Sequence, residues 1–181
     1  MYEGCDEGPT FLVDAKIAWY ANDGTGQFGP QQVITTAAPE DRRVYAADLD
    51  GDGDQDVLSA PSSFAGDDRI AWYANDGTGQ FGPQQVISTW DRGPKCVYAA
   101  DLDADGDLDV LSASYGDYPS YSHKIAWYAN DRMGQFGPQQ VITTKADGPT
   151  CVYAADLDGD GDLDVLSASY WDDKIAWYEN E

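Results

Sequence analysis

The chain has 181 residues, 42% of them apolar and 13% aromatic, so it is long and apolar enough to bury a core. Its 33 acidic and 10 basic residues give a formal net charge of -23. Nucleic acid is excluded as a partner, because phosphate binding needs clustered Lys and Arg, and here they are few and scattered. No stretch has the length and apolarity of a membrane span, and residues 1–15 lack the basic start and apolar core of a signal peptide. We therefore expect no membrane insertion.

A tetrapeptide repeats along the chain. Ile-Ala-Trp-Tyr begins at Ile17, Ile70, Ile125 and Ile175, with spacings of 53, 55 and 50 residues. Periods of this size are typical of solenoids and propellers. The units contain strand-type residues and Gly, Asn and Asp turns, and no stretch has the apolar period of an amphipathic helix. The sequence therefore predicts an all-β repeat array over residues 16–181, preceded by a lead-in at residues 1–15.

The first complete unit illustrates the expected elements in chain order. Residues 44–48 and 56–60 are predicted strands on either side of an acidic loop, and residues 69–74 are a third strand. The turn Asn75-Asp76-Gly77-Thr78-Gly79 leads to a fourth strand at about residues 84–88. Four short antiparallel strands per unit predict a β-propeller with four-stranded blades.

The number of blades is unusual for a propeller. Complete blades at residues 44–88 and 97–143 are flanked by partial blades at 16–35 and 152–178, which makes about three blades per chain. Closed propellers usually have four to eight blades. We therefore expect a homodimer in which two chains exchange terminal strands and close a six-bladed ring. The alternatives are a four-bladed monomer with incomplete end blades and a fragment of a longer propeller.

Each unit from the second onward contains the same nine-residue acidic loop. Oxygen ligands on alternate residues suit a cation of calcium size, with side chains at the first, third, fifth and ninth positions and a backbone carbonyl at the seventh. An EF-hand would need a Glu three residues after the loop, where Ser59, Ser112 and Ser167 stand. The predicted metal residues are Asp48, Asp50, Asp52, Asp54 and Asp56; Asp101, Asp103, Asp105, Asp107 and Asp109; and Asp156, Asp158, Asp160, Asp162 and Asp164.

We expect about three calcium ions (Ca²⁺) per chain with a structural role. Each loop uses its carboxylates on one ion and leaves no evident open position, whereas catalytic metals keep one for the substrate. Magnesium is the weaker candidate, because it prefers to keep several waters. The other reading is that the loops are solvated acidic turns without a metal.

These motifs resemble a known family. The order of Phe28-Gly29, the loop from Asp48 to Asp56 and Ser59-Ala60-Pro61 is similar to the FG-GAP repeat of integrin α-subunit propellers. The acidic run that begins at Asp156 resembles the related VCBS repeats. In place of the expected Gly-Ala-Pro, the later units have Ser112-Ala113-Ser114 and Ser167-Ala168-Ser169, which favours the broader VCBS group. The resemblance implies a calcium-binding β-propeller, usually extracellular, with the metal between the first two strands of a blade.

The binding of a partner is expected where the repeats differ. In a meander, the acidic loops and the Asn-Asp-Gly hairpins share one end, while the loops that differ between copies share the other. Candidate ligand-binding residues in these divergent loops are Trp90, Tyr115, Tyr118, Tyr121, Tyr170 and Trp171. Such aromatic side chains could stack on sugars, anchor a protein or simply pack against the blade edges. The aromatic residues shared by all units, Trp19, Trp72, Trp127 and Trp177, are instead predicted to be core.

The resulting hypothesis is a non-catalytic, calcium-binding recognition or adhesion module, secreted or at the cell surface. Its ligand would be a protein or a glycan. A multivalent lectin and an architectural repeat of a larger surface protein are the alternatives. An enzyme is not expected, because His123 is the only histidine and has no repeated Ser or Cys beside it that would suggest a catalytic triad.

Two of the three cysteines share a repeat position. Cys96 and Cys151 each stand just before a predicted first strand, where the first complete unit has Arg43. They could form a bridge across adjacent inner strands or remain free thiols, because matched repeat positions do not ensure the required separation. Cys5 could link two chains.

Overall fold

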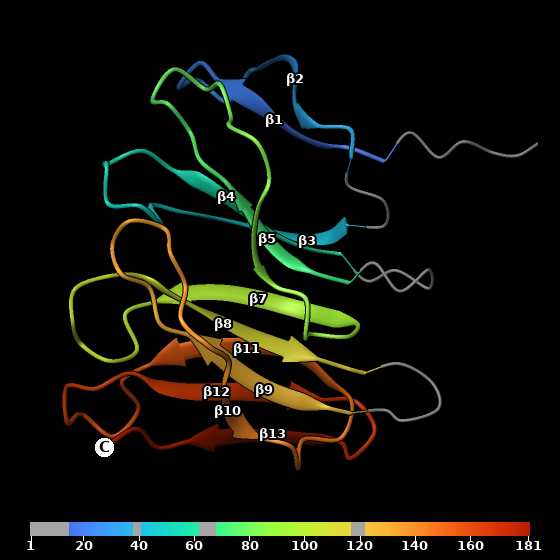
Figure 1. Cartoon of the computed structure of the whole chain (residues 1–181), viewed down its shortest axis with the longest axis vertical. Helices are drawn as coiled ribbons and strands as arrows, with labels where there is room; N and C mark the ends of the chain where they lie inside the picture. Colours follow the sequence, from blue (N-terminus) through green and yellow to red (C-terminus); the bar gives the residue numbers. More distant parts are fainter. Residues whose placement is uncertain (1–14, 38–40, 62–67, 117–121) are drawn as a thin grey trace, which may run out of the picture. The chain divides into compact units, whose positions relative to one another are not determined.

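The fold was analysed in a computed structural model, which describes residues 15–37, 41–61, 68–116 and 122–181. These residues form β-strands and no helix, and every strand pairing is antiparallel (Figure 1). The expectation of an all-β chain with antiparallel sheets is therefore confirmed. Among the described residues there is no helix with the length and apolar character needed to cross a membrane.

The chain divides into two units, Met1–Pro39 and Glu40–Glu181. The described part of the first unit is a hairpin of β1 (Ile17–Asn22) and β2 (Phe28–Thr35). Its turn is closed by short side chains: the Asn22 Oδ1 atom accepts a hydrogen bond from Gly24 N at 2.9 Å, and Asp23 Oδ1 accepts one from Thr25 N at 2.8 Å. Such Asx turns explain why Asn-Asp-Gly marks this hairpin in the sequence.

The second unit contains three sheets in which strands adjacent in sequence are also adjacent in space. The short chain connections between neighbouring strands favour this meander, since antiparallel neighbours can be joined by tight turns. The first sheet has β3 (Asp41–Ala47), β4 (Asp56–Pro61), β5 (Ile70–Tyr73) and β6 (Gln85–Ser88); the second has β7 (Pro94–Ala100), β8 (Asp109–Ser114), β9 (Lys124–Tyr128) and β10 (Gln140–Thr143); the third has β11 (Pro149–Ala155), β12 (Asp164–Ser169) and β13 (Lys174–Tyr178).

The first strand of each sheet begins earlier than the sequence suggested. β3, β7 and β11 start at Asp41, Pro94 and Pro149, three residues before the expected starts at Val44, Val97 and Val152. A register shift near the start of each strand, for example between Pro94 and Cys96, lets the strand pair across an irregular segment. Pro94 and Pro149 gave no strand signal, because proline cannot donate a backbone hydrogen bond and usually counts against a strand.

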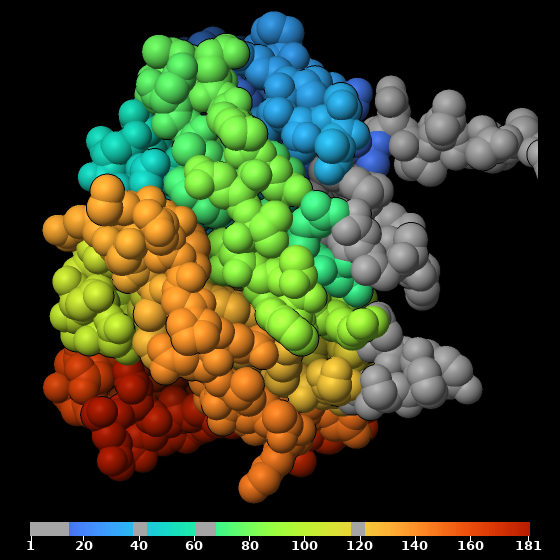
Figure 2. Space-filling view, viewed as in Figure 1, coloured from blue at the N-terminus to red at the C-terminus, as the bar shows by residue number. Residues whose placement is uncertain are grey.

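The core of the second unit lies between neighbouring sheets. One cluster joins the first sheet to the second and includes Leu58, Trp72 and Val110, all buried. Another joins the second sheet to the third and includes Leu111, Ile125 and Val165. The first three strands of the central sheet, β7, β8 and β9, are therefore buried on both faces, which explains why they lack a polar alternation. Figure 2 shows that the segment after β9, drawn in orange, lies on the visible surface of this unit.

The repeated tryptophans are not equally buried. Trp72 is 2% exposed, whereas Trp177 is 47% exposed, so its predicted place in the core is wrong. Trp72 is covered by the hairpin of the next sheet: a Cβ added at Gly134 would overlap its ring. Trp177 lies on β13, the outermost strand of its sheet, where no following hairpin of the described residues covers it.

Candidate metal centre

The three acidic loops follow the first strand of each sheet in the second unit, and they lie at the same end of that unit, on the left of Figure 1. Their sharp turns need left-handed backbone at the fourth and sixth positions. The φ angles there are 74° and 96° at Gly51 and Gly53, and 60° and 93° at Ala104 and Gly106. Glycine adopts this conformation without steric cost, whereas Ala104 does so against the usual preference. The loop shape is therefore retained even where the sequence departs from glycine.

Each loop brings three carboxylates together. In every group, one oxygen atom from each residue lies within 4.8 Å of the others. The groups consist of Asp48, Asp50 and Asp56; Asp101, Asp103 and Asp109; and Asp156, Asp158 and Asp160. The other predicted metal residues, Asp52, Asp54, Asp105, Asp107, Asp162 and Asp164, lie outside these groups.

The ninth aspartate closes each loop. Asp56 is fully buried, and its two oxygens accept hydrogen bonds from Leu49 N at 2.8 Å and Asn75 N at 2.9 Å. Asp109 accepts equivalent bonds from Leu102 N and Asn130 N, and Asp164 from Leu157 N and Asn180 N. Burial raises the pKa of Asp56 and of Asp109 to about 6, although these hydrogen bonds oppose the rise. Each of these carboxylates is therefore held in a buried position, where its negative charge is unfavourable unless a cation lies nearby.

The negative charge of the third aspartate in the first two loops is also unfavourable. The pKa of Asp50 is raised by burial and next by the charge of Asp52, and the pKa of Asp103 is raised by burial and by Asp105. Asp50 Oδ1 is buried and has no hydrogen-bond partner among the residues that the structure describes. A carboxylate oxygen without a donor, beside other carboxylates, fits a cation better than a solvated turn. The donor set contains only hard oxygen atoms, which suits calcium and does not suit zinc.

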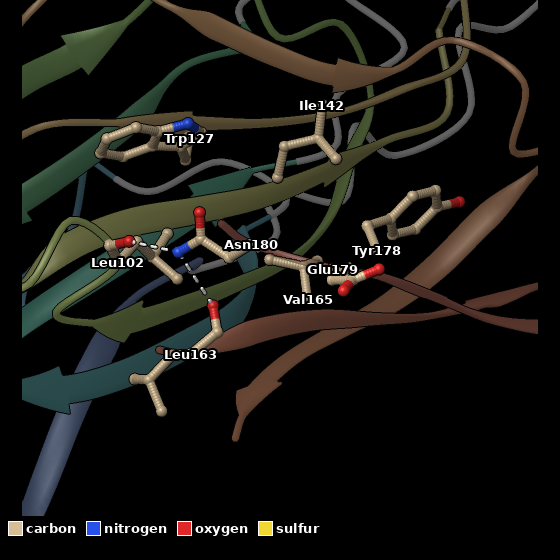
Figure 3. A pocket seen from close by; sticks show the side chains of 8 residues that line it. All are labelled: Leu102, Trp127, Ile142, Leu163, Val165, Tyr178, Glu179 and Asn180. Atoms are coloured by element: carbon tan, nitrogen blue, oxygen red, sulfur yellow. Dashed lines mark hydrogen bonds between the residues drawn. The ribbon is translucent and has the colours of Figure 1, made fainter. Parts of the chain in front are cut away.

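A repeated asparagine that the sequence reading missed connects these loops across sheets. Asn130 Nδ2 donates to Leu49 O of the first loop at 2.7 Å and to Leu108 O of its own sheet at 3.0 Å. Asn180 Nδ2 likewise donates to Leu102 O at 2.8 Å and to Leu163 O at 3.4 Å (Figure 3). The signal was present in the sequence, since an Asn stands two residues after every Ile-Ala-Trp-Tyr. These side chains tie the first and second loops to the sheets that follow them.

The small pocket in Figure 3 has a structural explanation. It has a volume of about 90 Å³ and lies between residues of the second and third sheets. Asn180 lines it together with apolar side chains such as Ile142 and Val165. Its size and apolar walls identify it as a packing gap at a sheet junction.

One hairpin differs from its copies at this end of the unit. Arg132, with φ of 65°, stands where the other hairpins have Gly24 and Gly77. Its Nε atom lies 2.7 Å from Asp107 Oδ1, and its Nη2 donates to Gly106 O at 3.2 Å. Arg132 also lies close to Gly51 and lines a hollow of about 300 Å³ between the first and second loops. The second loop is therefore paired with a cationic side chain.

The candidate ligand-binding aromatics fall into two groups. Trp90 and Tyr170 are 78% and 70% exposed. Tyr115 and Trp171 instead pack together with ring centres 4.7 Å apart, and His123 lies against both rings. Packing within the protein explains Tyr115 directly. Tyr118 and Tyr121 lie outside the described residues.

A polar network supports the groove beside Trp90. The groove has a volume of about 420 Å³, and Trp90, Lys124 and Gln139 line it. Lys124 Nζ donates to Trp90 O and to Gln139 Oε1, both at 2.8 Å. Beneath the groove, the fully buried Asp91 accepts hydrogen bonds from Ser114 Oγ at 2.7 Å, Ser112 Oγ at 3.2 Å, Gln139 Nε2 at 3.1 Å and the Tyr128 hydroxyl. The equivalent position in the next linker is Ala146, so this network is not part of the repeat.

These features define a class of protein. The chain is a repeat protein of antiparallel sheets, and each of the three sheets of the second unit has an acidic loop between its first two strands. FG-GAP-like repeats match at residues 11–59, 51–112 and 106–167. The chain belongs to the FG-GAP-like repeat family, and the resemblance noted from the sequence is confirmed. Repeats of this family fit a β-propeller and often bind calcium. No curated protein matches the chain.

Proposed function

We propose that this protein is a calcium-binding β-propeller module that recognises a ligand and has no catalytic role. The observation that supports the metal site best is the repeated gathering of three aspartates in each loop, with a buried, unpartnered oxygen on Asp50. The first, third and ninth aspartates would hold the ion in the first two loops. When bound, calcium would neutralise carboxylates that otherwise repel one another, and so it would stabilise the sheet junctions.

A structural ion predicts a large response to a chelator. Anything that binds only the folded state stabilises it, by about 2.7 kcal/mol per site at a free concentration 100 times the dissociation constant. The melting temperature should therefore fall markedly when calcium is removed and recover when calcium, but not sodium, is returned. An unchanged melting temperature in chelator would contradict a structural role for calcium.

We propose that the ligand binds at the end of the unit opposite the acidic loops. The supporting observation is the groove beside the exposed Trp90, with Lys124 and Gln139 in its wall. An exposed indole ring beside polar groups suits a protein anchor or a sugar ring. The family is typical of extracellular proteins, which supports a secreted or cell-surface location.

A carbohydrate ligand is the second candidate, and the flat, exposed indole of Trp90 favours it. An array of glycans probed with the calcium-loaded protein tests this directly. Trp90→Ala should abolish binding, whereas Met133→Ala should not, because Met133 is also largely exposed but lies at the acidic-loop end. A blank array with intact wild-type protein would favour a protein ligand or a purely architectural role.

We also propose that two copies associate through β13. Ile175 and Trp177 on this strand are 85% and 47% exposed, and β13 pairs with a described strand only on its β12 side. Residues 124–128 and 174–178 have the same sequence, and so do residues 28–35 and 136–143. β13 therefore has the sequence of β9, and β2 has the sequence of the segment that contains β10. Because β9 pairs with β10, β2 of a second copy has the residues needed to pair with β13. Light scattering should give twice the chain mass of 19.7 kDa, and the mass of one chain would exclude the dimer.

A further inference from the structure

Two thiols face each other across the junction of the second and third sheets. Cys96 lies on β7 and Cys151 lies on β11, and these first strands contact each other directly. Their Sγ atoms are 3.9 Å apart, although 55 positions separate the two residues in the sequence. Both thiols also point to one acceptor, the carbonyl oxygen of Val152, at 3.7 and 3.8 Å. The side chains are therefore directed toward the same point.

Strand pairing and aromatic packing fix the backbone on both sides of the cysteine pair. Cys96 pairs with Ala113 and Cys151 with Ala168 in matching registers, each just after the register shift at the start of its strand. Two residues further along each strand, the rings of Tyr98 and Tyr153 lie 4.8 Å apart. This aromatic contact holds the two strands side by side. A sulfur–sulfur bond of about 2.0 Å then requires only that the two side chains approach each other by rotation and a small strand adjustment.

We propose that Cys96 and Cys151 are a site of reversible oxidation, at which a disulfide joins the first strands of the second and third sheets. The site is specific to this junction. Arg43 holds the equivalent position at the other junction, where its Nε atom donates to Lys95 O at 2.7 Å. Only one of the two contacts between first strands in this unit can therefore be cross-linked.

The two thiols would react in a fixed order with a small disulfide such as oxidised glutathione. Cys151 is exposed and Cys96 is partly buried, so the thiolate of Cys151 attacks first and releases one glutathione thiolate. Burial raises the pKa of Cys96 to about 11, which makes its thiolate scarce at neutral pH and the second step slow. In that step Cys96 attacks the Cys151 sulfur and releases the second glutathione. Two protein thiols lose two electrons to the glutathione disulfide, and their two protons are taken up by the two glutathione thiolates.

The cross-link would change stability rather than shape. Closing a loop over 55 positions restricts the unfolded chain, and the facing geometry limits strain in the folded one. The oxidised protein should therefore melt several degrees above the reduced protein. This inference does not depend on calcium, so it can hold or fail independently of the proposed metal sites.

The test uses the full chain carrying Cys5→Ser, which leaves only the two facing thiols, since the sequence has three cysteines. The reduced protein is incubated with oxidised glutathione in chelator, then free thiols are counted and the linked peptides are mapped by mass spectrometry. We expect no free thiol, an intramolecular Cys96–Cys151 peptide and a raised melting temperature. In the matched control, Cys5→Ser with Cys96→Ser, Cys151 should accept one glutathione without a rise in melting temperature.

Two results would overturn the proposal. One is a stable glutathione adduct on Cys151 with Cys96 still reduced after prolonged incubation, also at pH 9, where the Cys96 thiolate is more abundant. The other is a cross-link found only between two chains. If the disulfide forms but the melting temperature does not rise, the pair does not stabilise this junction and that part of the inference is wrong.

Discussion

At the scale of single residues, the acidic loops combine two requirements that conflict in the absence of a cation. Asp56 and Asp109 must be buried to accept backbone hydrogen bonds from the loop and from the hairpin beside it. Burial and the neighbouring aspartates penalise their charged form. A bound cation removes this penalty, so the same residues can be structural and metal-binding.

The third aspartate of a loop offers a test in which binding and stability change in different directions. Asp103→Asn removes one carboxylate from a like-charged group, so the metal-free protein should be as stable as wild type or more stable. Calcium titration should show one site fewer. Asp131→Asn is the matched control: it makes the same charge change in the same sheet, but its side chain caps the hairpin at Met133 N and Gln135 N and lies outside the three groups. Equal calcium binding by both variants would contradict the assignment.

The buried aspartates also predict a pH dependence. A carboxyl whose pKa rises from 3.8 unfolded to about 6 folded stabilises the protein below about pH 4, and this contribution is lost as pH rises through 6. The melting temperature of the metal-free protein should therefore fall between pH 4 and pH 7. Because ligands must be deprotonated, the stabilisation by calcium should grow over the same range. Replacing both Asp56 and Asp109 by Asn should flatten the metal-free profile; an equally steep profile would assign it to other groups.

At the scale of the elements, Asn130 and Asn180, each two residues after the tyrosine of its repeat, couple neighbouring sheets. Asn130→Ala would leave two carbonyl oxygens, Leu49 O and Leu108 O, without their donor in a buried site, at a cost of about 2–3 kcal/mol. Asn75→Ala, the same change one sheet earlier, removes the bond from Nδ2 to Gln55 O and the long bond that Oδ1 accepts from Gly79 N at 3.2 Å, both within its own sheet and turn, and should cost about 1 kcal/mol. Chemical denaturation of the two variants measures the difference. Equal losses would show that the cross-sheet bond to Leu49 contributes little.

Substitutions of the hairpin glycines should also differ in their effect on stability, according to what surrounds each glycine. A Cβ at Gly134 would overlap the ring of Trp72, and the backbone there has a φ of 69°. Gly134→Ala should therefore destabilise the protein by about 2–4 kcal/mol through left-handed strain and overpacking. Gly26→Ala changes the equivalent repeat position, at φ of 89°, where the added Cβ meets nothing within 4 Å. Thermal melts in which Gly134→Ala is no worse than Gly26→Ala would contradict close packing of the hairpin on Trp72.

Repetition explains how much of these elements could be predicted from the sequence. Strand-type residues, Asn-Asp-Gly turns and the Asp spacing recur, so the all-β architecture, the hairpins and the acidic loops could be recognised without coordinates. What differs between copies depends on neighbours that are distant in sequence. The exposure of Trp177 depends on whether another hairpin covers it, and the close approach of Cys96 and Cys151 depends on strands brought together by packing. The polar network of Asp91 joins β8, β9 and the segment before β10, and no local pattern indicated it.

At the scale of the whole molecule, the second unit has two ends with different characters. One end repeats the same acidic loop and hairpin with few changes, and the other end varies between copies. This division supports the two proposals made above, that the constant end binds metal and the variable end recognises a ligand. Arg132 breaks the uniformity of the first end, and at the other end Lys145 and Ala146 replace Trp90 and Asp91 in the next linker.

The most direct test of this account is calorimetric titration of the metal-free protein with calcium at pH 7. We expect saturable binding at close to three sites per chain, with loss of one site in Asp103→Asn and none in Asp131→Asn. The absence of heat and of any shift in melting temperature at millimolar calcium would contradict it, and the loops would then be solvated acidic turns.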